Sequence, residues 1–408
     1  MTADDAIPHQ TDVLVAGGGL AGLAAAIALR QARPDLALEL IERTDAFAEV
    51  GAGIQLGPNA VRVLHDWGLQ TSLASIASYP LAVVARSARS GRELGCLPLG
   101  ERAISRYGAP YVTVHRADLH ALLLAEARRL GVDAHVGQTL AGVQTHEAAI
   151  QATSARGLEW QAQALLGCDG LWSQTRQAIW NGPAALFSGH IAYRGMVRMA
   201  ALPTDLRQSD VVVWLGSRMH AVQYPVRGGE WLNLVVVVHG ALPTDTPGWD
   251  HSADADTLRK AMGPGLARNL QRVLEAVAQW RCWPLYGRPS VRRPADLARG
   301  PVALLGDAGH PMRPYLAQGA AMAIEDAWTL GRLLSATPNP SPDWPALLQA
   351  WARARCKRCG WVQSRSVRNG YIFHASGPVR WARDAGMRLM GARLMDVPTL
   401  YQGPPNPL

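Results

Sequence analysis

The feature that most constrains the fold is a glycine-rich turn close to the start of the chain. Gly17, Gly19 and Gly22 have the G-x-G-x-x-G spacing and lie between an apolar stretch at 12–16 and an alanine-rich stretch at 20–30. This order predicts a buried strand, a tight turn and a helix, with glycines that let the backbone approach a pyrophosphate closely. The free N–H groups and partial positive charge at the helix start favour phosphate. The pattern therefore predicts a Rossmann-like α/β unit that binds a dinucleotide; a glycine-rich turn without a ligand is the alternative.

An acidic residue follows at the distance expected for ribose recognition. A second predicted strand covers 36–41 and ends at Glu42, which is 20 residues after Gly22. A carboxylate at this position accepts hydrogen bonds from ribose hydroxyls. We assign Glu42 and the adjacent Arg43 to the cofactor site. This unit alone does not distinguish FAD from NAD.

The composition favours a globular protein of a reducing compartment. A chain of 408 residues holds two or three domains, and its first twelve residues lack the apolar stretch of a secretory signal. Five cysteines fit the cytoplasm better than a disulfide framework. The C-x-x-C at 356–359 has no second Cys/His pair that would complete a zinc site. We therefore expect a cytoplasmic protein with no bound metal.

The charge pattern excludes some classes of partner. The formal charge is +8, but the basic residues are scattered arginines and two lysines, and no nucleic-acid-binding module is visible. Positive potential instead attracts an anionic aromatic acid and nicotinamide phosphates. No uninterrupted run of about 18 apolar residues occurs, so no stable membrane insertion is expected.

Two further motifs follow the glycine turn along the chain. The pattern D-G-x-x-S-x-x-R occupies 169–176, and Gly306-Asp307 precedes a predicted helix at 317–334. The three motifs in this order resemble those of the class A flavoprotein monooxygenases, the para-hydroxybenzoate hydroxylase-like group. The stretches most similar to 3-hydroxybenzoate 6-hydroxylases, salicylate hydroxylases and 6-hydroxynicotinate 3-monooxygenases are 51–68, 306–331 and 362–369.

The resemblance implies FAD as the bound cofactor, with NADH or NADPH as co-substrate and no second Rossmann domain. Glu42 would bind the ADP ribose, Arg116 the pyrophosphate, and Asp307 the ribityl chain. Asp169 would contribute to the FAD site and to the nicotinamide groove. The backbone at 319–320 would meet the pyrimidine edge of the flavin, where a helix N-terminus stabilises negative charge. The predicted cofactor-binding residues are Gly17, Gly19, Gly22, Glu42, Arg43, Gly53, Arg116, Asp169, Asp307, Gly319 and Ala320.

The pattern of apolar and polar residues along the chain also indicates separate regions. Alternating apolar and polar residues at 185–240 predict a separate antiparallel sheet, and 344–371 and 378–395 have helical spacing. We predict an α/β fold in which a Rossmann-like FAD-binding domain carries an inserted antiparallel β-sheet substrate domain and C-terminal helices. The predicted boundaries are 1–180 and 290–345 for the two parts of the FAD-binding domain, 181–289 for the substrate-binding sheet, and 346–408 for the C-terminal helical region.

One strand of the second region carries the predicted catalytic residues. His220 and Tyr224 share a face of the strand because side chains alternate with a period of two, and the spacing resembles a His and a Tyr that line the substrate site of these hydroxylases. Oxygen transfer is faster to a phenolate, and a histidine near neutrality can accept the phenolic proton. Tyr224 would fix the hydroxyl or carboxylate of the ring. Packing on the sheet, satisfied by backbone groups, is the alternative for both.

Three further residues are predicted to line the substrate pocket: Gln55, Pro311 and Tyr315. The carbonyl of Pro311 would lie near the flavin, whereas His310 would only brace the Gly-Asp turn. The resembling nicotinate enzymes have histidine where Gln55 and Tyr315 stand, so 6-hydroxynicotinate is disfavoured as substrate.

The sequence thus predicts an FAD-dependent monooxygenase that hydroxylates a small hydroxy-aromatic ring, expected to be an aromatic acid. The reaction uses NAD(P)H and O₂ through a C4a-hydroperoxyflavin, in a monomer or homodimer. Two alternatives remain open: a monooxygenase of a larger quinone precursor or polyketide, and a flavin reductase or redox-responsive binding protein that does not hydroxylate.

Overall fold

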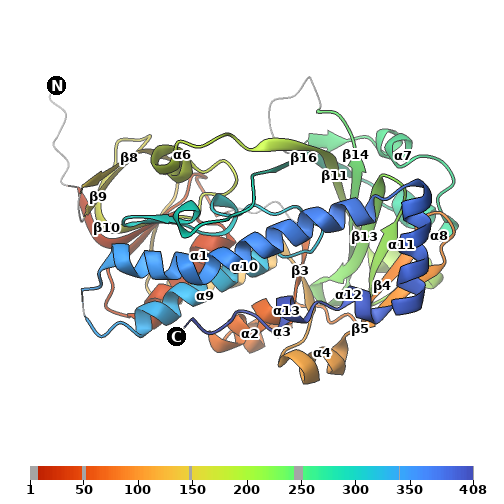
Figure 1. Cartoon of the computed structure of the whole chain (residues 1–408), viewed down its shortest axis with the longest axis horizontal. Coiled ribbons are helices and arrows are strands. Elements are labelled where there is room, and N and C mark those ends of the chain that lie inside the picture. Colours follow the sequence, from red (N-terminus) through yellow and green to blue (C-terminus); the bar gives the residue numbers. More distant parts are fainter. Residues whose placement is uncertain (1–7, 48–51, 147–148, 243–250, 340, 408) are drawn as a thin grey trace.

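The computed structural model has a mixed α/β architecture built on two eight-stranded sheets (Figure 1). It describes residues 8–47, 52–146, 149–242, 251–339 and 341–407. Gly51 and most of the polar segment that precedes the first strand therefore lie outside the described residues. None of the helices in the described ranges combines the length and hydropathy that a membrane-spanning segment requires.

The first sheet contains the strand that leads into the glycine turn. Its order is β17-β18-β10-β1-β2-β7, with β9 and then β8 added along the first part of β10. The run from β18 to β7 is parallel, and Val13, Leu14 and Val15 are fully buried, because such a sheet is covered on both faces. Its strands are β1 His9–Ala16, β2 Leu38–Ile41, β7 Asp133–His135, β8 Leu140–His146, β9 Ala149–Ser154, β10 Glu159–Gly167, β17 Ala298–Arg299 and β18 Val302–Leu304.

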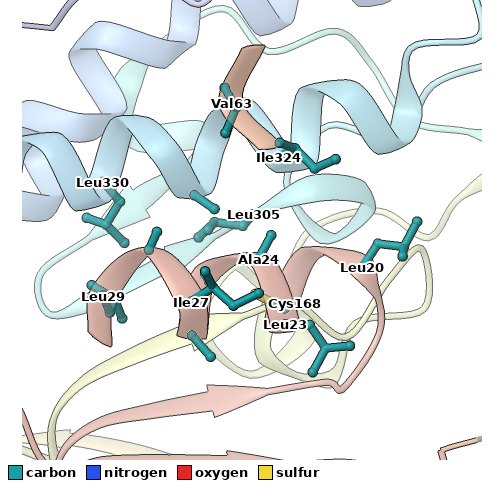
Figure 2. Packing of buried hydrophobic residues seen from close by; sticks show 14 of the residues in the cluster. Leu20, Leu23, Ala24, Ile27, Leu29, Val63, Cys168, Leu305, Ile324 and Leu330 are labelled. Carbon is teal, nitrogen blue, oxygen red and sulfur yellow. The ribbon is translucent and has the colours of Figure 1, made fainter. Parts of the chain in front are cut away.

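Helices from both ends of the chain cover this sheet. Helix α1 (Leu20–Ala32) packs against α9 (Gly319–Ser335), and Figure 2 shows apolar side chains of the two helices gathered between them. A Cβ atom on Gly331 would lie 2.9 Å from the carbonyl oxygen of Ala28, so glycine is needed for this close approach. The packing brings the start of α9, nearly 300 residues further along, next to the glycine turn.

The second sheet has the order β15-β16-β11-β14-β13-β12-β4-β5. Neighbouring strands are antiparallel except β4 and β12, which are parallel. The alternating pattern at 185–240 indicated the central strands, whereas β4 and β5 come from the early part of the chain and were not predicted. The strands are β4 Ala82–Ser87, β5 Glu93–Pro98, β11 Leu186–Arg198, β12 Val211–Leu215, β13 Met219–Val226, β14 Trp231–His239, β15 His251–Ala253 and β16 Trp280–Gly287.

Two elements connect the sheets. A small antiparallel pair, β3 (Gly53–Leu56) with β6 (Val112–His115), lies between them. Helix α10 (Trp344–Phe373) runs from the first sheet to the second, as the long blue helix in Figure 1. The remaining helices are α2 Pro58–Asp66, α3 Gln70–Ile76, α4 Gly100–Tyr107, α5 Arg116–Arg129, α6 Gln174–Trp180, α7 Ala255–Met262, α8 Arg268–Glu275, α11 Gly377–Met390, α12 Ala392–Met395 and α13 Pro398–Tyr401.

Candidate cofactor and substrate site

The three glycines of the first motif have different roles. Gly17 has a φ of +110°, and a Cβ atom on it would lie 2.5 Å from the carbonyl oxygen of Cys168. A Cβ atom on Gly22 would lie 1.8 Å from the carbonyl oxygen of Gly17. By contrast, no atom lies within 4 Å of the Cβ position of Gly19 among the described residues. Gly17 and Gly22 are therefore required for packing, whereas Gly19 faces open space that fits the close approach of a ligand.

The start of α1 is available to an anion. Its N-cap, Gly19, provides no side-chain cap, and the first turn contains no acidic residue. Glu42 lies beside the turn: its Oε2 accepts the N–H of Gly18 at 2.7 Å and its Oε1 accepts the N–H of Thr44 at 2.9 Å. Its Oε1 also accepts the hydroxyl of Thr44 at 2.9 Å. Because a carboxylate has about four acceptor positions, Glu42 retains capacity for about one further donor, such as a ribose hydroxyl. Arg43 is exposed next to it.

The Gly-Asp turn leaves one acidic side chain accessible within an otherwise buried segment. Asp307 is exposed, whereas Gly306 and Ala308 on either side are buried. The surrounding protein raises the pKa of Asp307 by desolvation, and His310 and Arg116 act in the opposite direction. Arg116, the first residue of α5, is thus close enough to Asp307 to act on its charge. An exposed acceptor in a rigid turn suits the hydroxyls of a ribityl chain.

The middle motif holds the Gly-Asp turn in place. Asp169 accepts the hydroxyl of Ser173 at 2.5 Å and the N–H of Thr175 at 2.9 Å. Ser173 in turn caps α6, because its hydroxyl oxygen accepts the N–H of Arg176 at 2.8 Å. Arg176 then donates to the carbonyl oxygens of Ala308 at 2.6 Å and Gly309 at 2.7 Å. The carboxylate of Asp169, predicted to contribute to cofactor binding, is therefore engaged at the start of α6, the helix from which Arg176 reaches the Gly-Asp turn.

A buried ionic network lies beneath the turn. Asp326 in α9 is the central residue: its carboxylate accepts from His310 at 2.5 Å, from Arg355 at 2.8 Å and from the N–H of Gly306 at 3.0 Å. Arg355 also binds Glu325 at 2.9 Å. Burial acts to raise the pKa of Asp326, but His310 and Arg355 hold it below its ordinary value.

The ionic network supports the view that His310 braces the turn, and its remaining members were not predicted. The sequence signal was the pair Glu325-Asp326 inside an otherwise apolar helix, which requires buried partners.

The start of α9 also lacks a side-chain cap. Gln318 is the N-cap, but its side-chain oxygen accepts from Asn59 at 3.1 Å instead of capping the helix. The Cβ position of Gly319 has no neighbouring atom within 4 Å among the described residues, and Ala320 beside it is half-buried. The backbone at 319–320 therefore has the open, electropositive surroundings that the edge of a flavin requires.

His220 lies in β13 and is 1% exposed. Its Nδ1 atom is 2.8 Å from Nε2 of His374, and its ring centroid is 5.4 Å from that of Tyr315. Burial, with a smaller contribution from His190, lowers the pKa of His220 to about 3. The expectation of a pKa near neutrality was therefore wrong: desolvation disfavours the charged imidazole, so His220 is a neutral but weak base.

The other predicted pocket residues make contacts within the protein. The hydroxyl of Tyr224 donates to the carbonyl oxygen of Gly53 at 2.6 Å, and Gln55 accepts the hydroxyl of Tyr111 at 2.7 Å. The carbonyl oxygen of Pro311 accepts from Gln363 at 3.1 Å. Tyr315 is 3% exposed, and its hydroxyl has no hydrogen-bond partner among the described residues. Tyr224 thus connects two strands, whereas Tyr315 presents a free polar group beside His220.

Comparisons with known proteins agree with this geometry. The family model described as "FAD binding domain" matches residues 10–358. The chain is 34% identical to a 3-hydroxybenzoate 6-hydroxylase of Polaromonas naphthalenivorans (strain CJ2), covering 92% of each chain. It is 35% identical to a 3-amino-4-hydroxybenzoate 2-monooxygenase of Streptomyces platensis, covering 96% of each. The crystal structure of HpxO of Klebsiella pneumoniae with FAD and uric acid has a similar fold, with a TM-score of 0.80 and 23% identity over 95% of this chain and 94% of that one.

Proposed function

The chain belongs to the class A flavin monooxygenases, in the family defined by the FAD binding domain, and from this premise we propose that it hydroxylates a monocyclic hydroxy-aromatic acid. It is an FAD-dependent aromatic monooxygenase. Relatives that cover 90% or more of the chain at 31–37% identity include enzymes named for 3-hydroxybenzoate and 3-amino-4-hydroxybenzoate. Both ligands are single rings that carry a carboxylate and a hydroxyl, which is the substrate class we propose here.

The residues around the two open helix starts fit FAD. The start of α1 and Arg116 would meet the pyrophosphate, Glu42 the adenosine ribose, and Asp307 the ribityl chain, while the backbone at 319–320 would face the pyrimidine edge. Bound FAD, once reduced by NADH or NADPH, supplies the activation of O₂. The contribution of the protein is to orient both partners, exclude water and hold protons.

The observation that carries the proposal is the contact between His220 and Tyr315. Tyr315 lies in the segment between the Gly-Asp turn and α9, and its ring packs on His220 of the second sheet at 5.4 Å between centroids. The second sheet therefore meets the proposed flavin edge at a histidine and a tyrosine. This supports the view that 181–289 form an inserted substrate-binding domain on the FAD-binding parts 1–180 and 290–345, with 346–408 as C-terminal helices, although β4 and β5 extend its sheet.

His220 would act on the phenolic proton of the substrate. With a pKa of about 3, caused mainly by burial, it is neutral at physiological pH and accepts a hydrogen bond rather than holding a full charge. The hydrogen bond between Nδ1 of His220 and Nε2 of His374 holds the ring of His220 in place. None of the five cysteines, all of which lie in the described part of the chain, forms a disulfide, which supports function in a reducing cytoplasm. The proposed assembly is a monomer or homodimer.

A substrate panel tests the proposed function. Purified, FAD-loaded protein is incubated with NADH or NADPH and with 3-hydroxybenzoate, salicylate, 3-amino-4-hydroxybenzoate or 6-hydroxynicotinate, while reductant oxidation and O₂ uptake are followed and products are identified by mass spectrometry. We expect one benzoate to stimulate oxidation and to gain one oxygen atom. Stimulation without any hydroxylated product would support a reductase instead. Hydroxylation of larger phenols alone would shift the assignment to a quinone-precursor or polyketide enzyme.

A variant tests the role of His220. His220→Ala should retain FAD and its reduction, whereas the ratio of product to NAD(P)H consumed should fall, with the hydroxylation step slowed by about tenfold, the effect of losing one hydrogen bond of about 1–1.5 kcal/mol. The loss should shrink at high pH, where the phenol ionises without help. His65→Ala, which removes a half-buried histidine from α2, is the control. An unchanged ratio at every pH would make His220 a packing residue only.

A further inference from the structure

Four histidines meet where the second sheet contacts the end of α10. His190 in β11, His220 in β13 and His239 in β14 come from neighbouring strands, and His374 follows α10 directly. Ring centroids of His190 and His239 are 4.4 Å apart, and the ring of His374 lies 5.0 Å from that of His190 and 5.1 Å from that of His239. This cluster was not predicted, because its members are far apart along the chain.

We propose that His190, His239 and His374 form a binding site for a divalent transition-metal ion, with Zn²⁺ as the expected ion. One nitrogen from each ring lies within 4.8 Å of the other two. The Nε2 atoms of His190 and His239 face each other at 3.1 Å. Two nitrogens that each bind zinc at its usual distance, with tetrahedral geometry, are separated by about 3.3 Å. The two rings are thus already spaced as a pair of ligands.

His374 supplies the third nitrogen. It is 6% exposed, its Nε2 atom is taken by His220, and its Nδ1 atom has no hydrogen-bond partner among the described residues. A buried imidazole nitrogen without a partner is costly, and coordination of a metal would relieve this cost. His190 and His239 are only half-buried, so an ion can enter from their side.

The protonation states suit metal binding. Burial is the main cause that lowers the pKa of His190 to about 4 and of His374 to about 2, and it also lowers the pKa of His239. All three rings are therefore neutral at pH 7, which is the form that coordinates metals. Three imidazoles favour Zn²⁺, Cu²⁺, Ni²⁺ or Co²⁺ over Ca²⁺ or Mg²⁺.

Nearby arginines predict the kind of fourth ligand. Each of the three rings has an arginine near enough for its positive charge to disfavour a second positive charge on the ring. The pairs are Arg313 with His190, Arg218 with His239, and Arg383 with His374. A bare cation would be repelled, whereas a metal with an anionic fourth ligand carries less net charge. We therefore expect chloride, hydroxide or a carboxylate at the fourth position.

Two other groups of possible ligands are less suited. In the first, His310 and Cys359 surround Asp326, but the carboxylate of Asp326 is committed to Arg355 and to the backbone of the Gly-Asp turn. In the second, His9 and His135 flank Glu39, whose Oε2 already accepts the indole N–H of Trp160 at 2.8 Å. This second group is the competitor that the experiment must separate.

The test measures metal bound to FAD-loaded protein. After treatment with a chelator, the protein is dialysed against micromolar ZnCl₂ and its zinc content is measured by mass spectrometry, with affinities from calorimetry. We expect one equivalent in the native protein, and at least about 100-fold weaker binding in His190→Ala and His239→Ala. His135→Ala and His65→Ala are matched controls that should retain the ion. No stoichiometric zinc, or loss of zinc in His135→Ala but not in His239→Ala, would overturn the proposal.

A second measurement does not depend on variants. Cu²⁺ replaces Zn²⁺ in the native protein, and pulsed electron paramagnetic resonance counts the imidazoles bound to it. Three imidazoles support the site, and two or fewer contradict it. FAD content and unfolding midpoint, measured for each variant, ensure that loss of metal is not loss of fold.

Discussion

The substitution Asp326→Asn tests how much the fold depends on the buried ionic network. Asp326 is fully buried, and it accepts hydrogen bonds from His310, Arg355, the N–H of Gly306 and, at 3.8 Å, the thiol of Cys359. Asparagine keeps the volume but removes the negative charge, which leaves Arg355 with one carboxylate fewer and removes the partner that keeps the pKa of His310 raised. Breaking a buried pair in this way costs about 3–5 kcal/mol.

The expected shift in unfolding temperature follows from chain length. For 408 residues, the unfolding entropy is about 0.9 kcal/mol per kelvin, so this cost lowers the midpoint by roughly 3–6 °C. The assay is thermal unfolding of FAD-free protein followed by circular dichroism, together with the dissociation constant of FAD. Asp256→Asn, which removes an exposed pair to Arg259 at 2.7 Å, is the control and should cost at most about 1 kcal/mol.

A shift for Asp326→Asn no larger than that of Asp256→Asn would refute the reasoning, because the buried carboxylate would then contribute no more than a surface one. We also expect weaker FAD binding in Asp326→Asn, since the bond to Gly306 fixes the turn that carries Asp307. Unchanged FAD affinity would mean that the ionic network stabilises the fold but does not contribute to FAD binding.

Three further predictions concern the cofactor and pH. Asp307→Ala should weaken FAD retention by roughly 1–3 kcal/mol, measured by fluorescence titration, because ribityl hydroxyls would lose their acceptor; unchanged affinity would contradict its role. Gly319→Val should impair FAD binding without lowering the unfolding midpoint of FAD-free protein, since its Cβ position is open, whereas Gly386→Val, also open, should leave FAD binding unchanged. The folded pKa values of His220 and His374 lie below 6.5, so their contribution to stability is complete above pH 6.5 and is lost as pH falls, by about 2 kcal/mol each at pH 5. The substitution His374→Gln should therefore reduce the difference between the free energies of unfolding at pH 7 and at pH 5. An equal difference in the variant and the native protein would exclude this contribution of His374.

The cofactor half of the molecule could be predicted because its signals are local. A G-x-G-x-x-G turn follows β1 and begins α1, and the expected long helix at 317–334 is observed as α9. The roles of these glycines in packing and in the approach of a ligand depend on only a few neighbouring residues. Arg176 was recognised as the last residue of the middle motif, but its contact with the Gly-Asp turn was not predicted, because that contact spans 132 positions and is set by tertiary packing.

The substrate half was less accessible for the same reason. Strand β4 pairs with β12, which is more than 120 residues away, and short strands such as these carry little signal of their own. His374 was not predicted because nothing near the end of α10 indicates that it meets His220. The pKa of His220 could not be predicted either, since it depends on burial, which the alternation of residues along β13 does not quantify.

The position of the second sheet relative to the cofactor site depends on Gly53. Its N–H donates to the side chain of Asn233 at 2.7 Å, and its carbonyl oxygen accepts the hydroxyl of Tyr224 at 2.6 Å. A Cβ atom on Gly53 would lie 2.6 Å from the ring of Tyr224 and 2.7 Å from the amide of Asn233, so no other residue allows this approach. Both bonds are buried, and each contributes about 1 kcal/mol. Together they fix the neighbouring strands β13 and β14, and with them His220, against β3. Tyr224 is therefore better explained as a positioning residue than as a substrate-binding one, because the proton that it would offer to a substrate already holds this junction together.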